Sequence, residues 1–272
     1  LNQITRGESL NPDAIYLTML NKQDFRNLSE KKGILIISPD NIQEFIPLLN
    51  DSGLSIVRND SGTWGQILRR CRAVPCNRIT IVDNYILSKA ESFEKNLKPI
   101  LESLLPENAE HNFPVEIYST LVNVSDGKKS PVDFYDTWKN ITDIIRNIKR
   151  AYPISLCVVK YFHKDKPFHD RTIFTNNLWI GSGAGFDLFR HDDLYYGTPE
   201  SVSLFDNVLA DDSGIINPSV DKVTRLADYI KTSTLSKGDE NMFRQLTGDM
   251  LYYLALLVQE FIILYSICRF LP

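Results

Sequence analysis

After its first 77 residues, the sequence alternates short apolar runs with longer amphipathic stretches, and this alternation most limits the folds open to the chain. The apolar, β-branched runs at 78–87, 115–121 and 154–162 predict strands. Residues 90–105 and 133–150 repeat apolar side chains every three or four positions and predict helices. The run at 154–162 is almost unbroken, as expected of a strand covered on both faces. We therefore predict an α/β fold in which helices sandwich a mixed sheet.

A smaller set of the same elements comes first and predicts an additional N-terminal α/β portion. Strands are expected at 15–20, 33–38 and 54–58, and helices at 41–49 and 63–74. Pro75-Cys76-Asn77 then interrupts the chain. We divide the chain into an N-terminal α/β portion (1–75), a core (76–190) and a loop-rich and helical C-terminal extension (191–272).

The C-terminal extension gives weaker signals. Aspartates at 192, 193, 206, 211 and 212 suggest a divalent cation, but their spacing fits no known metal-binding loop, so we expect solvated turns and no metal. Short helices are expected at 220–230 and 240–246. The apolar tail at 250–272 is interrupted by Glu260, which suits a buried helix better than a membrane span. A membrane-facing or partner-facing surface stays open as the alternative.

Charge and cysteine content limit the functions open to the chain, although local basic patches remain possible. A net charge of −4 provides no overall positive field to attract nucleic acid or anionic lipid. Four cysteines without a C-x-x-C pair or a neighbouring histidine indicate reduced thiols and argue against a zinc site. We see no secretory signal at the start of the sequence and expect a cytoplasmic protein without cofactors.

The stretch from Phe168 to Phe189 carries the most distinctive chemistry. His169, Asp170 and Arg171 precede a short β-like run, which leads into the glycine-rich turn 181–185. A guanidinium offers a planar fork of donors, and glycines let backbone N–H groups approach an anion closely. This set predicts a phosphate site. The alternative is a strand, turn and strand whose polar side chains only hydrogen-bond the turn.

The same stretch resembles the phospholipase D superfamily, whose motif reads His-x-Lys, four residues, Asp, six residues, then Gly-Ser or Gly-Gly. On that spacing His169 takes the position of the nucleophile and Arg171 that of the lysine. Asn176 replaces the aspartate, Gly183 matches the glycine, and Ala184 replaces the serine. The stretch is closer to the degenerate phospholipase-D-like domain at the C-terminus of MIT-domain proteins, through Asn177, Trp179 and the run from Gly183 to Phe189. The likeness extends over residues 78–189.

The resemblance implies a chemistry of two histidines. Enzymes of the superfamily use one histidine to attack phosphorus and a second to protonate the leaving oxygen. This chain has one such motif, and His111, His163 and His191 do not form another. A symmetric dimer could bring two copies of His169 together. The replacements at Arg171 and Asn176 nevertheless predict that catalysis is absent or weak.

We therefore expect a non-catalytic module that binds a phosphate-bearing ligand: nucleic acid, a lipid head group or a phosphorylated partner. The alternatives are a dimeric phosphodiesterase or nuclease that uses His169, and a structural or partner-binding domain. In the structural alternative, Arg171 would pair with a carboxylate such as Asp83 or Asp187. The predicted phosphate-binding residues are His169, Arg171, Asn176, Ser182 and Gly183.

Overall fold

The computed structural model describes residues 15–18, 24–49, 64–88, 92–110, 112–120, 122–125, 128–131, 133–160, 171–182, 185–189, 201–204 and 242–247. The helices are α2 (Asp24–Lys32), α3 (Ile42–Leu49), α4 (Trp64–Ile67), the 3₁₀-helix η1 (Leu68–Ala73), the π-helix η2 (Phe93–Leu97), α6 (Lys98–Leu104) and α7 (Phe134–Ile148). The strands are β1 (Ile15–Leu17), β2 (Leu35–Ile37), β3 (Ile79–Val82), β4 (Phe113–Ser119), β5 (Val122–Ser125), β6 (Lys128–Pro131), β7 (Ile154–Lys160), β8 (Arg171–Phe174), β9 (Leu178–Ser182), β10 (Ser201–Leu204) and β11 (Met242–Thr247).

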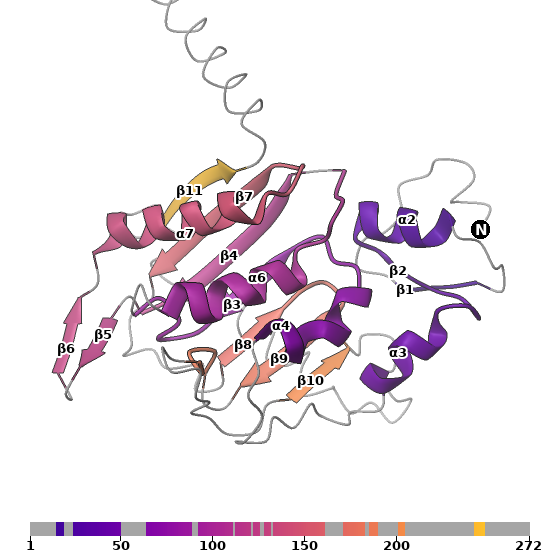
Figure 1. Cartoon of the computed structure of the whole chain (residues 1–272), viewed down its shortest axis with the longest axis horizontal. Coiled ribbons are helices and arrows are strands. Elements are labelled where there is room, and N and C mark those ends of the chain that lie inside the picture. The colour runs from indigo at the N-terminus through magenta and orange to yellow at the C-terminus, as the bar shows by residue number, and fades with distance from the viewer. Residues whose placement is uncertain are drawn as a thin grey trace, which may run out of the picture.

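A seven-stranded mixed sheet forms the centre, in the order β10-β9-β8-β3-β4-β7-β11 (Figure 1). β3, β4 and β7 run parallel, and the remaining neighbours pair antiparallel. The predicted mixed α/β architecture is confirmed at this level. β1 and β2 form a separate parallel pair, and β5 and β6 form a hairpin that the apolar pattern does not predict.

The helix predicted at 240–246 is wrong. The chain there forms β11, which pairs antiparallel with β7 from Met242 opposite Val159 to Thr247 opposite Ile154. A strand at this position forms hydrogen bonds with the backbone N–H and C=O groups along the edge of β7. Such pairing readily overrides the helix propensity of a short segment. β10 likewise forms in a segment that we expected to be loop. The strand predicted at 54–58, the helix predicted at 220–230 and the apolar tail at 250–272 lie outside the described residues.

One row of aliphatic side chains crosses five strands of the sheet. Ile81 of β3 pairs with Ile117 on one side and Ile173 on the other, and the row continues to Val158 and Ile180. All five side chains are fully buried. β-branched residues pack well on a pleated surface, so this row explains why apolar strands so distant in sequence assemble in this register.

Helices α4, α6 and α7 lie over one face of this sheet, which shows the predicted helix layer for that face (Figure 1). α7 begins at Asp133, whose carboxylate accepts the N–H of Asp136 at 2.8 Å. It ends where Lys149 adopts a left-handed conformation. The helix predicted at 90–105 is present as η2 followed by α6. The helix predicted at 63–74 is present as α4 followed by the tighter η1.

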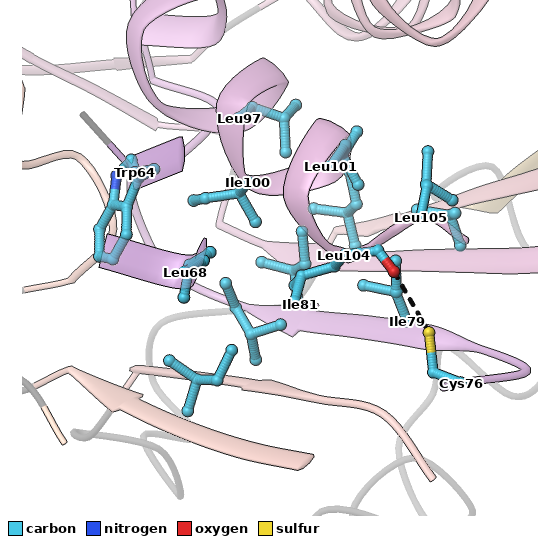
Figure 2. Close-up of a cluster of buried hydrophobic side chains, with 14 of the residues drawn as sticks. Trp64, Leu68, Cys76, Ile79, Ile81, Leu97, Ile100, Leu101, Leu104 and Leu105 are labelled. Carbon is cyan, nitrogen blue, oxygen red and sulfur yellow. Dashed lines mark hydrogen bonds between the residues drawn. The ribbon is translucent and has the colours of Figure 1, made fainter. Parts of the chain in front are cut away.

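The apolar core is continuous across residue 75. Figure 2 shows Trp64 and Leu68 packed with Leu97, Ile100 and Ile81, all of them fully buried. The two sides of our predicted boundary therefore share one core, and the division at 75 describes the order of elements along the chain. Among the described helices, none is both long enough and apolar enough to span a lipid bilayer.

Cys71 and Cys76 are expected to resist alkylation in the folded protein. Burial raises the pKa of each thiol from 9.0 to about 12, and the Cys76 thiol donates to the carbonyl of Leu104 at 3.3 Å (Figure 2). Only the thiolate reacts, so a rise of about three units in the pKa of the thiol slows alkylation at pH 8 roughly a thousandfold. Iodoacetamide at pH 8 with peptide mass spectrometry should label both cysteines in urea and neither in buffer. Labelling of either in buffer at the rate of a free thiol would contradict this packing.

Candidate functional site

Three neighbouring strands bring polar residues to one edge of the seven-stranded sheet. β3 ends at Val82, and the antiparallel β8 begins beside it because Val82 pairs with Thr172. Arg171 in turn pairs with Ser182 at the end of β9. Asp83 directly follows β3, so it lies at the same edge, which we call the carboxyl edge. Ligands of open α/β sheets commonly bind beyond the carboxyl ends of the parallel strands.

Asp83 is the buried anchor of the carboxyl edge, with 1% of its surface exposed. Its Oδ1 accepts the backbone N–H groups of Tyr85 at 2.6 Å and Ile86 at 3.0 Å. Its Oδ2 accepts the N–H of Phe186 at 2.7 Å. A carboxylate that accepts from residues two and three positions ahead fixes a tight turn. The third bond ties this turn to the segment after β9.

Arg171 is half-buried beside this carboxylate. Its guanidinium carbon lies 5.9 Å from the centre of the Tyr85 ring, within cation–π range. Burial raises the pKa of the Asp83 carboxyl, while the three backbone N–H donors and the positive charge of Arg171 act in the opposite direction. The structure thus places Arg171 next to Asp83, the first of the two carboxylates that we named as its alternative partners.

Gly185 and Ser182 close the turn that faces this pair. The Ser182 hydroxyl is buried; it donates to the carbonyl of Gly185 and accepts the N–H of the same residue at 2.8 Å. Gly185 has φ +98°, which a side chain rarely tolerates. A Cβ there would lie 3.0 Å from Oδ2 of Asp83. Ser182 is the cross-strand neighbour of Arg171, and its hydroxyl forms hydrogen bonds with Gly185 within the turn.

Asn176 is separated from the other site residues. It follows the far end of β8, five positions after Arg171, which in a strand is a distance of about 17 Å. Its amide donates to the carbonyl of Gly33 at 2.8 Å and accepts the N–H of Asn77 at 2.9 Å. Gly33 adopts φ +63°, and a Cβ on it would meet the carbonyl of Cys76 at 2.5 Å. Asn176 thus stabilises the point where the backbone at Gly33 passes close to the backbone at Cys76 and Asn77. It does not lie near Arg171.

His169 and Gly183, the two remaining predicted site residues, lie outside the described residues. Of the five, the structure therefore brings together Arg171 and Ser182 and places Asn176 elsewhere. Asp83, which is buried, lies beside Arg171 and Ser182 at the same edge of the sheet.

A second buried polar group, which is not among the predicted site residues, holds the segment after β9. Asn96 of η2 has no exposed surface. Its oxygen accepts from the indole N–H of Trp64 at 3.0 Å and from the backbone N–H groups of Leu188 at 3.2 Å and Phe189 at 2.9 Å. Its amide nitrogen donates to the carbonyl of Phe189 at 2.9 Å and to Asp187 at 3.2 Å. The available signal was a lone polar residue on the apolar face of an expected helix.

Asp187 belongs to this second group and not to the pair with Arg171. Besides the Asn96 amide, it accepts a hydrogen bond from the hydroxyl of Ser92. The Trp64 ring packs against Phe186 and Phe189, with centroids 5.5 Å and 5.9 Å away. Residues 185–189 are consequently fixed from both sides, by Asp83 and by Asn96.

Within the described ranges, no group of three or more histidine, cysteine, aspartate or glutamate side chains could hold a metal ion. Comparison of this chain with protein-family models, with curated proteins and with solved structures gave no match.

Proposed function

We propose that this chain is a non-catalytic, phospholipase-D-like module that binds a phosphate-bearing ligand at the carboxyl edge, with Arg171 as the cation that receives the phosphate. The observation that carries the proposal is the position of Arg171 at the first residue of β8, where β3 ends and β9 ends. A cation at this edge stands where α/β folds place their ligands. Nucleic acid, lipid head groups and phosphorylated proteins share the phosphate that it would recognise.

The surroundings of Arg171 support a pre-organised guanidinium. Asp83 is held by three backbone N–H groups, and Tyr85 follows in the same turn, so the neighbours of Arg171 have little freedom to move. A guanidinium remains charged at any physiological pH. Fixing the cation in advance lowers the entropy that binding costs.

The proposal excludes efficient catalysis. In the superfamily motif an aspartate stands at the position of Asn176, and here that side chain is engaged with Gly33 and Asn77. Hydrolysis of bis-p-nitrophenyl phosphate, DNA, RNA and phospholipid vesicles should therefore stay near background. Turnover that disappears in His169→Ala would favour the dimeric phosphodiesterase instead.

A second candidate, a structural or partner-binding domain, has its own support. Asp83 beside Arg171 offsets the positive charge, and the Ser182 hydroxyl is engaged with Gly185. In that case Arg171 would stabilise the fold by compensating a buried carboxylate.

Phosphate titration separates the two candidates. Inorganic phosphate should raise the melting temperature of the wild-type protein. At a phosphate concentration of 100 times Kd, binding adds about 2.7 kcal/mol to the free energy of unfolding. Arg171→Lys keeps the charge beside Asp83 but loses the planar fork, so its phosphate Kd should rise at least tenfold. Arg146→Gln, at an exposed arginine of α7, is the matched control and should behave as wild type.

Comparison among the three proteins removes the general stabilising effect of phosphate salts, which is equal in all of them. The binding proposal fails if phosphate raises the melting temperatures of wild type, Arg171→Lys and Arg146→Gln by the same amount. If Arg171→Lys is then also less stable than the other two proteins, Arg171 is structural.

A further inference from the structure

An open pocket of about 460 Å³ lies in the N-terminal portion, apart from the carboxyl edge. It is formed by α2, by the residues after β2, by the first turns of α3, by the end of η1 with the chain after it, and by the chain after α6. Ser38, which directly follows the parallel strand β2, is in its lining, so the pocket lies beyond the carboxyl end of a parallel pair. Its volume falls within the range of small-molecule sites.

Charges of both signs line this pocket. Arg26 of α2 and Arg72 of η1 contribute two exposed guanidiniums. Asp40 and Glu44 contribute two exposed carboxylates at the start of α3. Within the described part of the chain, no ion pair and no side-chain hydrogen bond engages any of these four groups. Two positive and two negative groups thus face one pocket without compensating each other through contact.

The other two carboxylates of the lining have structural partners. Glu30 accepts the backbone N–H groups of Glu107 at 3.0 Å and Asn108 at 3.2 Å. The Glu107 carboxylate lies 3.3 Å from the guanidinium of Arg150. Glu30 thereby ties α2 to the chain after α6, and Glu107 pairs with a cation outside the lining. The four groups without such partners are two of each sign. Phe25 and Phe45, both buried, add apolar surface.

We propose that this pocket binds a free α-amino acid. The ligand carboxylate would lie at Arg26 and Arg72, the ammonium at Asp40 and Glu44, and the side chain against the two phenylalanines. An arginine fork suits a carboxylate, and carboxylates suit an ammonium. A ligand with both charges can engage both the two guanidiniums and the two carboxylates that have no partner, whereas phosphate alone or a polyamine alone would engage one sign and be repelled by the other.

The test uses the twenty free L-amino acids as probes, each titrated into the whole protein by calorimetry. At least one should bind saturably at a stoichiometry of one. Its N-acetyl derivative and its carboxamide, which each lack one charge, should bind at least tenfold more weakly. Arg72→Gln and Glu44→Gln should each raise the Kd for that amino acid at least tenfold. Both side chains are exposed, so the variants should keep the wild-type melting temperature.

Arg146→Gln and Asp143→Asn, at an exposed pair on α7, are the matched controls and should leave the Kd unchanged. The inference is overturned if none of the twenty binds, or if the amide or the acetylated form binds as well as the free amino acid. It is also overturned if Arg72→Gln and Glu44→Gln bind like wild type. Arg171→Lys should not alter amino-acid binding, so this test and the phosphate titration fail or succeed independently.

Discussion

Replacing Asp83 by asparagine is expected to destabilise the fold by about 4 kcal/mol, although the two side chains have nearly the same shape. The carboxylate accepts three backbone N–H groups through both oxygens. The oxygen of an asparagine can still accept the N–H groups of Tyr85 and Ile86. Its amide nitrogen, which is a donor, would then face the N–H of Phe186, and neither of these two donors would have an acceptor. Arg171 would also lose its neighbouring negative charge. Urea denaturation monitored by circular dichroism measures the free energy of unfolding.

Asp143→Asn is the control for this substitution, because Asp143 is an exposed aspartate 3.5 Å from Arg146. Its loss should cost at most about 0.5 kcal/mol. Asp83→Asn combined with Arg171→Met should lose less than the sum of the single changes, since the second change removes the charge that the first leaves uncompensated. An Asp83→Asn protein within 1 kcal/mol of wild type would show that this carboxylate does not hold the carboxyl edge.

Asn96→Leu is the second substitution with a large expected effect, about 3 kcal/mol. Leucine fills similar space, but the indole N–H of Trp64 and the N–H groups of Leu188 and Phe189 lose their common acceptor. Each buried donor left unpaired costs about 1–3 kcal/mol, and the Trp64 indole keeps a second acceptor, the carbonyl of Phe186 at 3.1 Å. Urea denaturation again gives the value.

Asn140→Leu tests the same chemical change at a half-buried position of α7 and should cost less than 1 kcal/mol. Trp64→Phe removes one of the three donors. A double-mutant cycle of the free energy of unfolding with Asn96→Leu and Trp64→Phe should show coupling between positions 64 and 96. Additive losses would mean that the indole bond contributes little.

The elements with strong apolar periodicity could be predicted, and those without it could not. β4, β7 and α7 follow directly from their side-chain patterns. α2 was not predicted because its sequence, DFRNLSEKK, carries only Phe25 and Leu28 as apolar anchors. β11 was predicted as a helix because the edge that it pairs with lies more than 80 residues earlier in the chain. Local preference carries no information about such an edge.

The candidate site divides in the same way. Asp83 and Arg171 could be connected because each borders a strand, and strand ends meet at sheet edges. The role of Asn176 could not, since motif spacing says nothing about a carbonyl at Gly33 that approaches from another part of the fold. The engagement of Ser182 with Gly185 depends on the positive φ of one glycine in the turn.

The buried polar contacts also constrain how the protein can be made. Trp64 reaches Phe186 across 122 residues, Asp83 reaches the same segment across 103, and Asn176 returns to Gly33 across 143. During translation the early polar groups must remain hydrated until residue 189 has left the ribosome. Contacts between such distant parts of a chain form slowly, and waiting intermediates expose apolar strands. Because β3 is made well before β8, nascent chains halted between residues 90 and 170 should depend on chaperones more than the finished protein does.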